Sequence, residues 1–306
     1  MAADLVQPPS LDEASKILEA EDEAMPIAGG TDVIVDLRAG RIDPSLLVDL
    51  SKIPGLGGIK VQEESIRLGS LTRVIEIQGH EALARDSAAI VEAARVLGSI
   101  QIRAGATIGG NVCNASPAAD LIPPLLVFGA WTHISGVSGQ KKLPVSEFFK
   151  GPRSTALARG DLLTAIEWKT PGPGSGSTYL RQTVRWAMDL AGVGVAASIR
   201  VDDASVVVDA RVALGAVAPT PILPVGASSL LIGKPFSNEA AREVGRALAE
   251  QATPISDARG TEEYRRHVVE VLVARALFIA HAKAVGEWPK GVLAPTNGRQ
   301  PGIVDI

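Results

Sequence analysis

Two double-glycine segments are the strongest candidates in this chain for a ligand-binding site. The first, IAGGTD at residues 27–32, lies between a short apolar run and a helical stretch. Adjacent glycines leave backbone N–H groups uncovered, and a following helix directs the positive end of its dipole toward the turn. This combination favours a phosphate group, although a Gly-Gly turn before a helix is also an ordinary connection.

The second segment, ATIGGN at residues 106–111, has the same character and continues into a polar stretch, NASPAAD, at residues 114–120. Backbone groups in a polar stretch beside a core need hydrogen-bond partners. A pyrophosphate would supply acceptors for the N–H groups, and Asp120 could accept from ribose hydroxyls. A cluster of side-chain turns that satisfies itself is the structural alternative.

A third glycine pattern, Gly192 to Ala197, matches the G-x-G-x-x-A form of a dinucleotide site. A dinucleotide site follows a parallel-sheet strand and opens a helix. Here residues 185–190 do not form such a strand, and residues 193–201 have strand character in place of a helix. We therefore predict that these glycines allow close packing of a strand.

The remaining reactive side chains predict no catalytic residue and no metal site. The four histidines occur singly, and the chain has no G-x-S-x-G motif. Cys113 is the only cysteine and has no histidine nearby, so we interpret it as a small buried apolar residue. One cysteine cannot form an intramolecular disulfide or hold an iron–sulfur cluster. Because no side chain here is a convincing nucleophile or acid/base pair, a cofactor could carry the chemistry.

Composition limits the class of protein. With 306 residues the chain can form two domains, and 46% hydrophobic and 21% charged residues are typical of a soluble protein. A net charge of -4 gives no reason to expect nucleic acid. We see neither a signal peptide nor an apolar run of about 20 residues that could cross a membrane, and we expect a cytoplasmic protein.

Periodicity and turn residues predict the elements that position these segments. Ser10 and Glu13 are predicted to form a capping box for a first helix, and Thr72 is predicted to cap a later one. Pro123-Pro124 is expected to lie in a loop. The segment PGPGSGS at residues 171–177 is predicted to be a linker between domains. Helices are expected at residues 14–18, 33–38, 74–78, 88–97, 239–251 and 261–285, and strands at 25–28, 46–50, 65–69, 131–135, 162–168, 179–184, 192–201 and 204–213.

Six motifs occur in order along the chain: AGGTD (28–32), TIGGNVCNASPAAD (107–120), FFKGPRSTAL (148–157), MDLAGVGVAA (188–197), GAVAPTP (215–221) and YRRHVVEVLVARAL (264–277). Together the series resembles the FAD-binding medium subunit of the xanthine dehydrogenase/carbon monoxide dehydrogenase family of molybdenum hydroxylases. The resemblance implies an α+β fold. Residues 1–175 would form a PCMH/vanillyl-alcohol-oxidase-type domain of two α/β subdomains, about 1–55 and 56–175, with FAD between them. Residues 176–287 would form a three-stranded antiparallel sheet with a helical bundle, and residues 288–306 a tail.

The resemblance also implies the cofactor-binding residues. Both double-glycine loops would bind the FAD pyrophosphate, Asp120 would lie near the ribose and adenine, and Arg181 would approach the flavin. Leu97 and Leu163 match apolar positions beside the cofactor. The full implied set is Ala28, Gly29, Gly30, Thr31, Asp32, Leu97, Thr107, Ile108, Gly109, Gly110, Asn111, Asp120, Leu163 and Arg181.

Partner chains follow from the same resemblance: a large molybdopterin subunit that hydroxylates the substrate and a small iron–sulfur subunit with [2Fe-2S] clusters, assembled as a dimer of heterotrimers. Electrons would pass from molybdenum through the clusters to FAD and on to NAD or a quinone. Carbon monoxide-type members commonly have AGGHS in the first loop, so AGGTD favours a purine, N-heterocycle or aldehyde substrate. A self-contained flavin oxidoreductase of the same fold and a non-catalytic assembly subunit are the alternatives.

Overall fold

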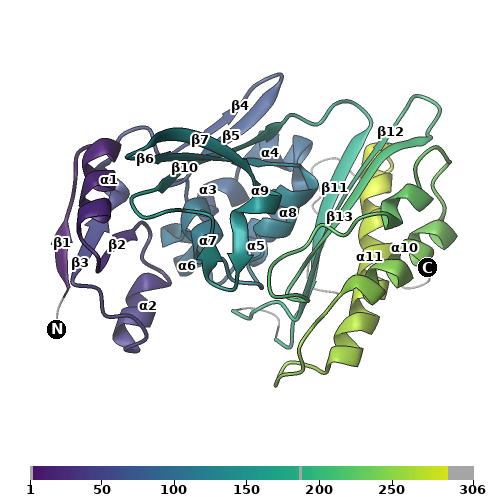
Figure 1. Cartoon of the computed structure of the whole chain (residues 1–306). Helices are drawn as coiled ribbons and strands as arrows, with labels where there is room; N and C mark the ends of the chain where they lie inside the picture. Colours follow the sequence, from purple (N-terminus) through teal and green to yellow (C-terminus); the bar gives the residue numbers. More distant parts are fainter. Residues whose placement is uncertain (1–2, 186–187, 289–306) are drawn as a thin grey trace.

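The computed structural model describes residues 3–185 and 188–288, and its three parts lie in a row in Figure 1. We call residues 3–55 the N-terminal subdomain, residues 56–169 the second subdomain and residues 175–288 the C-terminal domain. Each part is built around its own sheet. Within the described residues, every helix is too short or too polar to span a membrane.

The N-terminal subdomain is a parallel sheet in the order β1-β3-β2, with helices α1 and α2. Ser10 caps α1 by accepting from the amide of Glu13 at 3.3 Å, which confirms the N-cap half of the predicted capping box; in the described chain the Glu13 side chain does not return the bond. Ala14 and Leu18 on α1 pack against Val48 on β3. The elements are β1 (Asp4–Val6), α1 (Leu11–Ala20), β2 (Ala24–Ile27), α2 (Val33–Arg38), β3 (Leu46–Asp49) and the 3-10 turn Leu50–Lys52.

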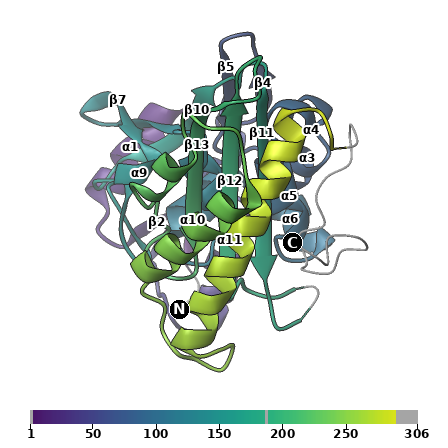
Figure 2. The same ribbon diagram turned by 90° about the vertical axis from the view of Figure 1, so that its right-hand side faces the viewer.

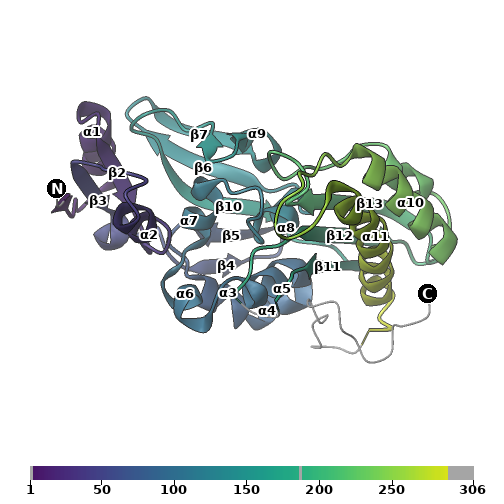
Figure 3. The ribbon, with the colours of Figure 1, turned by 90° about the horizontal axis from the view of Figure 1, so that it is seen from below.

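The second subdomain is an antiparallel sheet in the order β4-β5-β10-β6-β7, and Figure 3 shows α3 to α6 gathered on one side of it. Ile66, Ile166 and Trp168 are buried between sheet and helices. Its elements are β4 (Ile59–Val61), β5 (Ser65–Gly69), α3 (Val74–Gln78), α4 (Glu81–Asp86), α5 (Ala88–Val96), α6 (Ile100–Gly105), α7 (Ile108–Asn114), α8 (Ile122–Val127), β6 (Trp131–Gly136), β7 (Gly139–Pro144), α9 (Val145–Phe148), β8 (Phe149–Gly151), β9 (Ser154–Thr155) and β10 (Leu162–Lys169).

The C-terminal domain is the antiparallel sheet β11-β12-β13 with two long helices, α10 and α11, which lie in front of the sheet in Figure 2. Because side chains alternate along a strand, Tyr179 faces the core of the second subdomain while its neighbour Leu180 faces the core under α11. The sheet is therefore buried on both faces and joins the two units. The elements are β11 (Ser175–Gln182), β12 (Val193–Val201), β13 (Val207–Gly215), the 3-10 turn Ala227–Leu230, α10 (Asn238–Gln251) and α11 (Glu262–Ala284).

Three expectations about local structure are wrong. The linker predicted at residues 171–177 ends early, because β11 begins at Ser175. Thr72 does not cap α3; Arg73 occupies that position, and the Thr72 hydroxyl donates to the Gly58 carbonyl at 2.9 Å. The two prolines predicted to lie in a loop begin α8 instead, where a proline costs no helical hydrogen bond.

The interpretation of the third glycine pattern is confirmed. Gly194 lies within β12, paired with Arg181 on β11 and Gly215 on β13. A Cβ built on Gly194 would lie 2.6 Å from the hydroxyl of Tyr179. This glycine therefore makes room for a neighbouring side chain and does not form a phosphate turn.

Candidate functional site

The fold brings the two double-glycine segments together. We call residues 27–32 loop 1 and residues 106–111 loop 2. A Cβ built on Gly29 would lie 2.7 Å from the carbonyl carbon of Gly105, the last residue of α6, and closer still to its oxygen. It would lie 3.2 Å from the Cα of Ala106, the first residue of loop 2. A Cβ built on Gly105 would lie 3.6 Å from the Gly29 oxygen and from the Thr31 methyl carbon. Only glycine allows this approach, so the two subdomains meet where both predicted phosphate loops lie.

Loop 1 presents a series of amides that lack protein acceptors. Among the residues that the structure describes, none accepts a backbone hydrogen bond from Gly29, Gly30, Thr31, Asp32 or Val33. These amides lead into the first turn of α2, and Gly30 has a φ of +69°. Free N–H groups at a helix start attract an anion, so loop 1 has the chemistry of a phosphate site.

Loop 2 differs from its prediction, because its glycines begin α7 and its amides are already used. Gly109 donates to the Ser70 carbonyl at 2.8 Å, and Gly110 donates to the Thr107 hydroxyl at 3.0 Å. Ile108 likewise donates to Thr72 at 3.0 Å. The expectation of uncovered amides is therefore wrong here. A Cβ on Gly109 would lie 2.6 Å from the Ser70 oxygen, so this glycine lets α7 pack against the end of β5.

Loop 2 nonetheless offers polar atoms to a ligand. Within the described residues, Oδ1 of Asn111 and Oγ of Ser70 are buried without a hydrogen-bond partner. A Cβ built on Gly110 would have only the Thr107 hydroxyl within 4 Å, at 3.0 Å, so the backbone there is open. Buried polar atoms in native proteins are almost always paired. These atoms therefore fit a bound group that carries hydroxyl or N–H donors.

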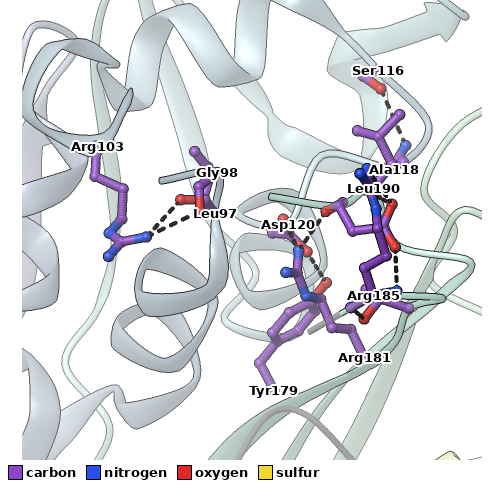
Figure 4. A network of polar contacts seen from close by, with 12 residues as sticks. Leu97, Gly98, Arg103, Ser116, Ala118, Asp120, Tyr179, Arg181, Arg185 and Leu190 are labelled. Carbon is purple, nitrogen blue, oxygen red and sulfur yellow. Dashed lines mark hydrogen bonds and ion pairs between the residues drawn. The ribbon is translucent and has the colours of Figure 1, made fainter. Parts of the chain in front are cut away.

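Asp120 and Arg181 lie together as a buried ion pair with Tyr179 (Figure 4). Oδ1 of Asp120 accepts from the Tyr179 hydroxyl at 2.7 Å, and Oδ2 accepts from Nη1 of Arg181 at 3.0 Å. Tyr179 and Arg181 share a face of β11 because they are two residues apart. Sequence reasoning missed Tyr179, although this spacing from Arg181 is visible in the strand pattern.

Burial and charge oppose each other in this cluster. Burial raises the pKa of Asp120, while the Arg181 guanidinium and the Tyr179 hydrogen bond lower it. Burial also raises the pKa of Tyr179 well above its ordinary value, so the phenol keeps its proton and donates it. Nη1 of Arg181 donates a second bond to the Asp189 carbonyl at 3.2 Å. Nε of Arg181 is buried without a partner in the described chain, so one donor remains for a ligand.

The two leucines of the predicted site lie in different surroundings. Leu97 is the C-cap residue directly after α5, and its carbonyl accepts from Nη1 of Arg103 at 3.0 Å, as Figure 4 shows. Nε of Arg103 donates to the Gln78 side chain at 2.6 Å, which fixes the guanidinium. Leu163 is 4% exposed on β10, with its side chain in the core of the second subdomain.

Asp36 and Arg153 form a connection that sequence reasoning missed. Asp36, on α2, accepts from Nη1 of Arg153 at 2.5 Å and from Nη1 of Arg41 at 2.8 Å. The hydrogen bond from Arg153 and then that from Arg41 lower the pKa of Asp36. Desolvation and the Asp36 charge raise the pKa of Asp32 in loop 1. Arg153 lies in the FFKGPRSTAL motif, so the motif itself was a signal for this contact.

Comparison with known proteins agrees with this geometry. Residues 1–168 match the model of the FAD binding domain in molybdopterin dehydrogenase, and residues 178–279 match that of the CO dehydrogenase flavoprotein C-terminal domain. The glyceraldehyde dehydrogenase medium chain of Sulfolobus acidocaldarius is 32% identical over 271 residues, which cover 89% of this chain and 95% of the relative. The xanthine dehydrogenase FAD-binding subunit of Escherichia coli is 29% identical over 280 residues, covering 91% and 96%.

Solved structures give the same result. The carbon monoxide dehydrogenase of Hydrogenophaga pseudoflava, in a form that lacks the Mo-pyranopterin moiety of its molybdenum cofactor, matches with a TM-score of 0.89 and 26% identity. The match covers 92% of this chain and 98% of that one. The resemblance and the α+β fold expected from the sequence are thus confirmed. The chain belongs to the FAD-binding medium subunits of the xanthine dehydrogenase/carbon monoxide dehydrogenase family of molybdenum hydroxylases, and FAD is its cofactor.

Proposed function

We propose that this chain is the electron-transfer subunit of a cytoplasmic, multi-subunit molybdenum hydroxylase. Bound FAD would supply the redox chemistry, taking electrons from [2Fe-2S] clusters of a small partner chain and passing them to NAD or a quinone. The relatives are named as medium chains or FAD-binding subunits, which supports further chains in the complex. A single cysteine in the whole sequence leaves the clusters to a partner.

Loop 1 is the part of the chain that would bind the pyrophosphate, and its unpartnered amides carry this proposal. The N–H groups from Gly29 to Val33 lack acceptors in the described chain, and they lie at the positive end of α2. Each charge-assisted hydrogen bond to a phosphate contributes about 1.5–3 kcal/mol. A few such bonds hold FAD tightly without a covalent link. Ala28, before these residues, joins them to β2.

The other predicted residues would form the walls of the FAD site or make single hydrogen bonds to the cofactor. Loop 2, including Thr107 to Gly110, packs α7 against Ser70 and so sets the second wall of the site. Oδ1 of Asn111 would accept from a hydroxyl or N–H of the cofactor, and Asp120 from a ribose hydroxyl. Nε of Arg181 would donate on the flavin side. We place Leu97 and Leu163 behind the cofactor.

The purified complex tests this proposal. We expect one FAD per chain, and copurification with an iron-containing chain and a much larger molybdenum-containing chain, measured by visible absorbance and metal analysis. A colourless chain that does not take up FAD would refute the flavin role. Substrate turnover by this chain alone would identify it as a self-contained flavin oxidoreductase. Unchanged complex activity after bulky replacement of Gly29 and Gly109 would identify an assembly subunit.

A further inference from the structure

Arg153 connects the two halves of the FAD site through its side chain. It lies in the second subdomain, in the turn between β8 and β9, whereas Asp36 lies on α2, directly after loop 1. Nη1 of Arg153 donates to Oδ2 of Asp36 at 2.5 Å across a sequence separation of 117 residues. The Asp36 side chain is only 7% exposed, so the carboxylate is held inside this contact.

The backbone of the same residue is bonded to the other half of the site. The amide of Arg153 donates to the carbonyl of Ala115 at 3.0 Å, and Ala115 is the C-cap residue of α7, the helix that begins in loop 2. Arg153 has a φ of +57° and Ala115 a φ of +48°, a region that residues other than glycine seldom adopt. Such conformations persist where surrounding contacts enforce them. Arg153 thus contacts the helix after loop 1 and the helix after loop 2.

Charge gives Arg153 a second effect on the same site. Asp32 lies within loop 1 and Asp36 one turn later on α2, where two carboxylates would repel an incoming pyrophosphate. Arg153 and Arg41 both pair with Asp36 and balance its charge. The positive charge of Arg153 also opposes the rise in the pKa of Asp32.

We propose that Arg153 is a positioning residue that holds loop 1 against loop 2 and thereby slows the release of FAD. It acts through Asp36 and does not touch the cofactor. The Gly29–Gly105 contact has no side chain to fasten it, and the Arg153–Asp36 ion pair is a side-chain link across the same boundary that joins the helices of both loops. This inference rests on the proposed role of the loops in binding FAD.

The rate of FAD dissociation from the full-length chain, purified with its accompanying chains, tests the proposal. We expect Arg153→Gln to raise this rate about tenfold, because one partner of a mostly buried carboxylate is removed. The effect is not larger because the Arg153 side chain is 57% exposed and its charge is partly screened. Arg41→Gln is the matched control, since Arg41 pairs with the same carboxylate at 2.8 Å from within the N-terminal subdomain. It should change the rate less than about twofold.

A double-mutant cycle separates action through Asp36 from direct contact with FAD. If Arg153 acts through Asp36, adding Arg153→Gln to Asp36→Asn causes little further increase in the rate of FAD dissociation. A full additional tenfold effect in the Asp36→Asn background would mean that Arg153 binds the cofactor itself, and would overturn the proposal. If Asp36→Asn is too unstable to purify, equal rates for Arg153→Gln and Arg41→Gln overturn it as well.

Comparison of Arg153→Gln with Gly29→Val separates the role of Arg153 from the role of the loops in binding FAD. If Gly29→Val speeds FAD release while Arg153→Gln does not, the loops bind FAD but Arg153 does not hold them. If neither change affects release, FAD is not bound by these loops. Thermal unfolding of each variant without FAD shows whether the apoprotein keeps its fold.

Discussion

The substitution Gly29→Ala measures how much the contact between the loops contributes to FAD affinity. The new Cβ would lie 2.7 Å from the carbonyl carbon of Gly105, and 3.2 Å from the Cα of Ala106. Ordinary contact begins at 3.4 Å and the Gly105 oxygen lies nearer than its carbon, so the two backbones must separate by more than roughly 0.7 Å. Both sides are backbone, so neither can yield by changing a rotamer.

The expected size of the effect follows from this overlap. Overpacking of a close contact costs about 1–3 kcal/mol. The loops can relieve the overlap only by opening, which moves the loop 1 amides away from the phosphates. We therefore expect the dissociation constant for FAD to rise about 5- to 150-fold. Titration of the apoprotein with FAD, followed by flavin fluorescence, gives this constant directly.

Gly57→Ala is the control for this experiment. Gly57 is exposed, no described atom lies within 4 Å of a Cβ built there, and its φ is outside the left-handed region. It should bind FAD within about twofold of the wild type. If Gly29→Ala binds FAD as tightly as Gly57→Ala, the contact between the loops does not set the affinity for FAD.

Three further outcomes are expected. Tyr179→Phe leaves the buried carboxylate of Asp120 short of a donor and should lower the free energy of unfolding by about 1–3 kcal/mol; an unchanged urea midpoint would contradict this. Cys113 is partly buried beside the core of the second subdomain rather than fully buried as expected, and desolvation raises the pKa of its thiol to about 12. A thiol reagent near pH 8 should therefore label the folded chain far more slowly than the unfolded chain; comparable rates would show that the thiol is accessible and ionised. The pKa of Asp36 is lowered in the folded state, so its ion pairs stabilise the chain above the unfolded-state value of about 3.9 and are lost as pH falls through the folded value. The melting temperature of Asp36→Asn should therefore fall less steeply than that of the wild type between about pH 6 and pH 3, and parallel curves would count against this contribution.

Elements with strong local signals were predicted well. The apolar face of α11 is buried as its 3.6-residue period indicates, with Val269, Leu272, Val273, Ala276 and Leu277 each at most 5% exposed. The N-cap of α1 and the three strands of the C-terminal sheet also follow from local patterns. In these elements, neighbouring residues supply most of the information, because period and capping act over a few positions.

Loop 2 shows why local signals were insufficient at the site. The sequence shows that Gly109 and Gly110 adjoin polar residues, but not that carbonyls at Ser70 and Thr72 take up the nearby amides. These acceptors are more than thirty residues away in the sequence. A free amide and a paired amide have the same local sequence, so only the tertiary structure distinguishes loop 1 from loop 2.

Ordered motifs and a cysteine count do not depend on distances in space, so they were enough to predict the family, the cofactor and an iron–sulfur cluster held by another chain. Tertiary structure decided which residues are partners. It made an ion pair of Asp120 and Arg181, left Nε of Arg181 without a partner in the described chain, and joined Arg153 to Asp36. Charged groups interact according to distance and burial, and both are set only when the subdomains pack.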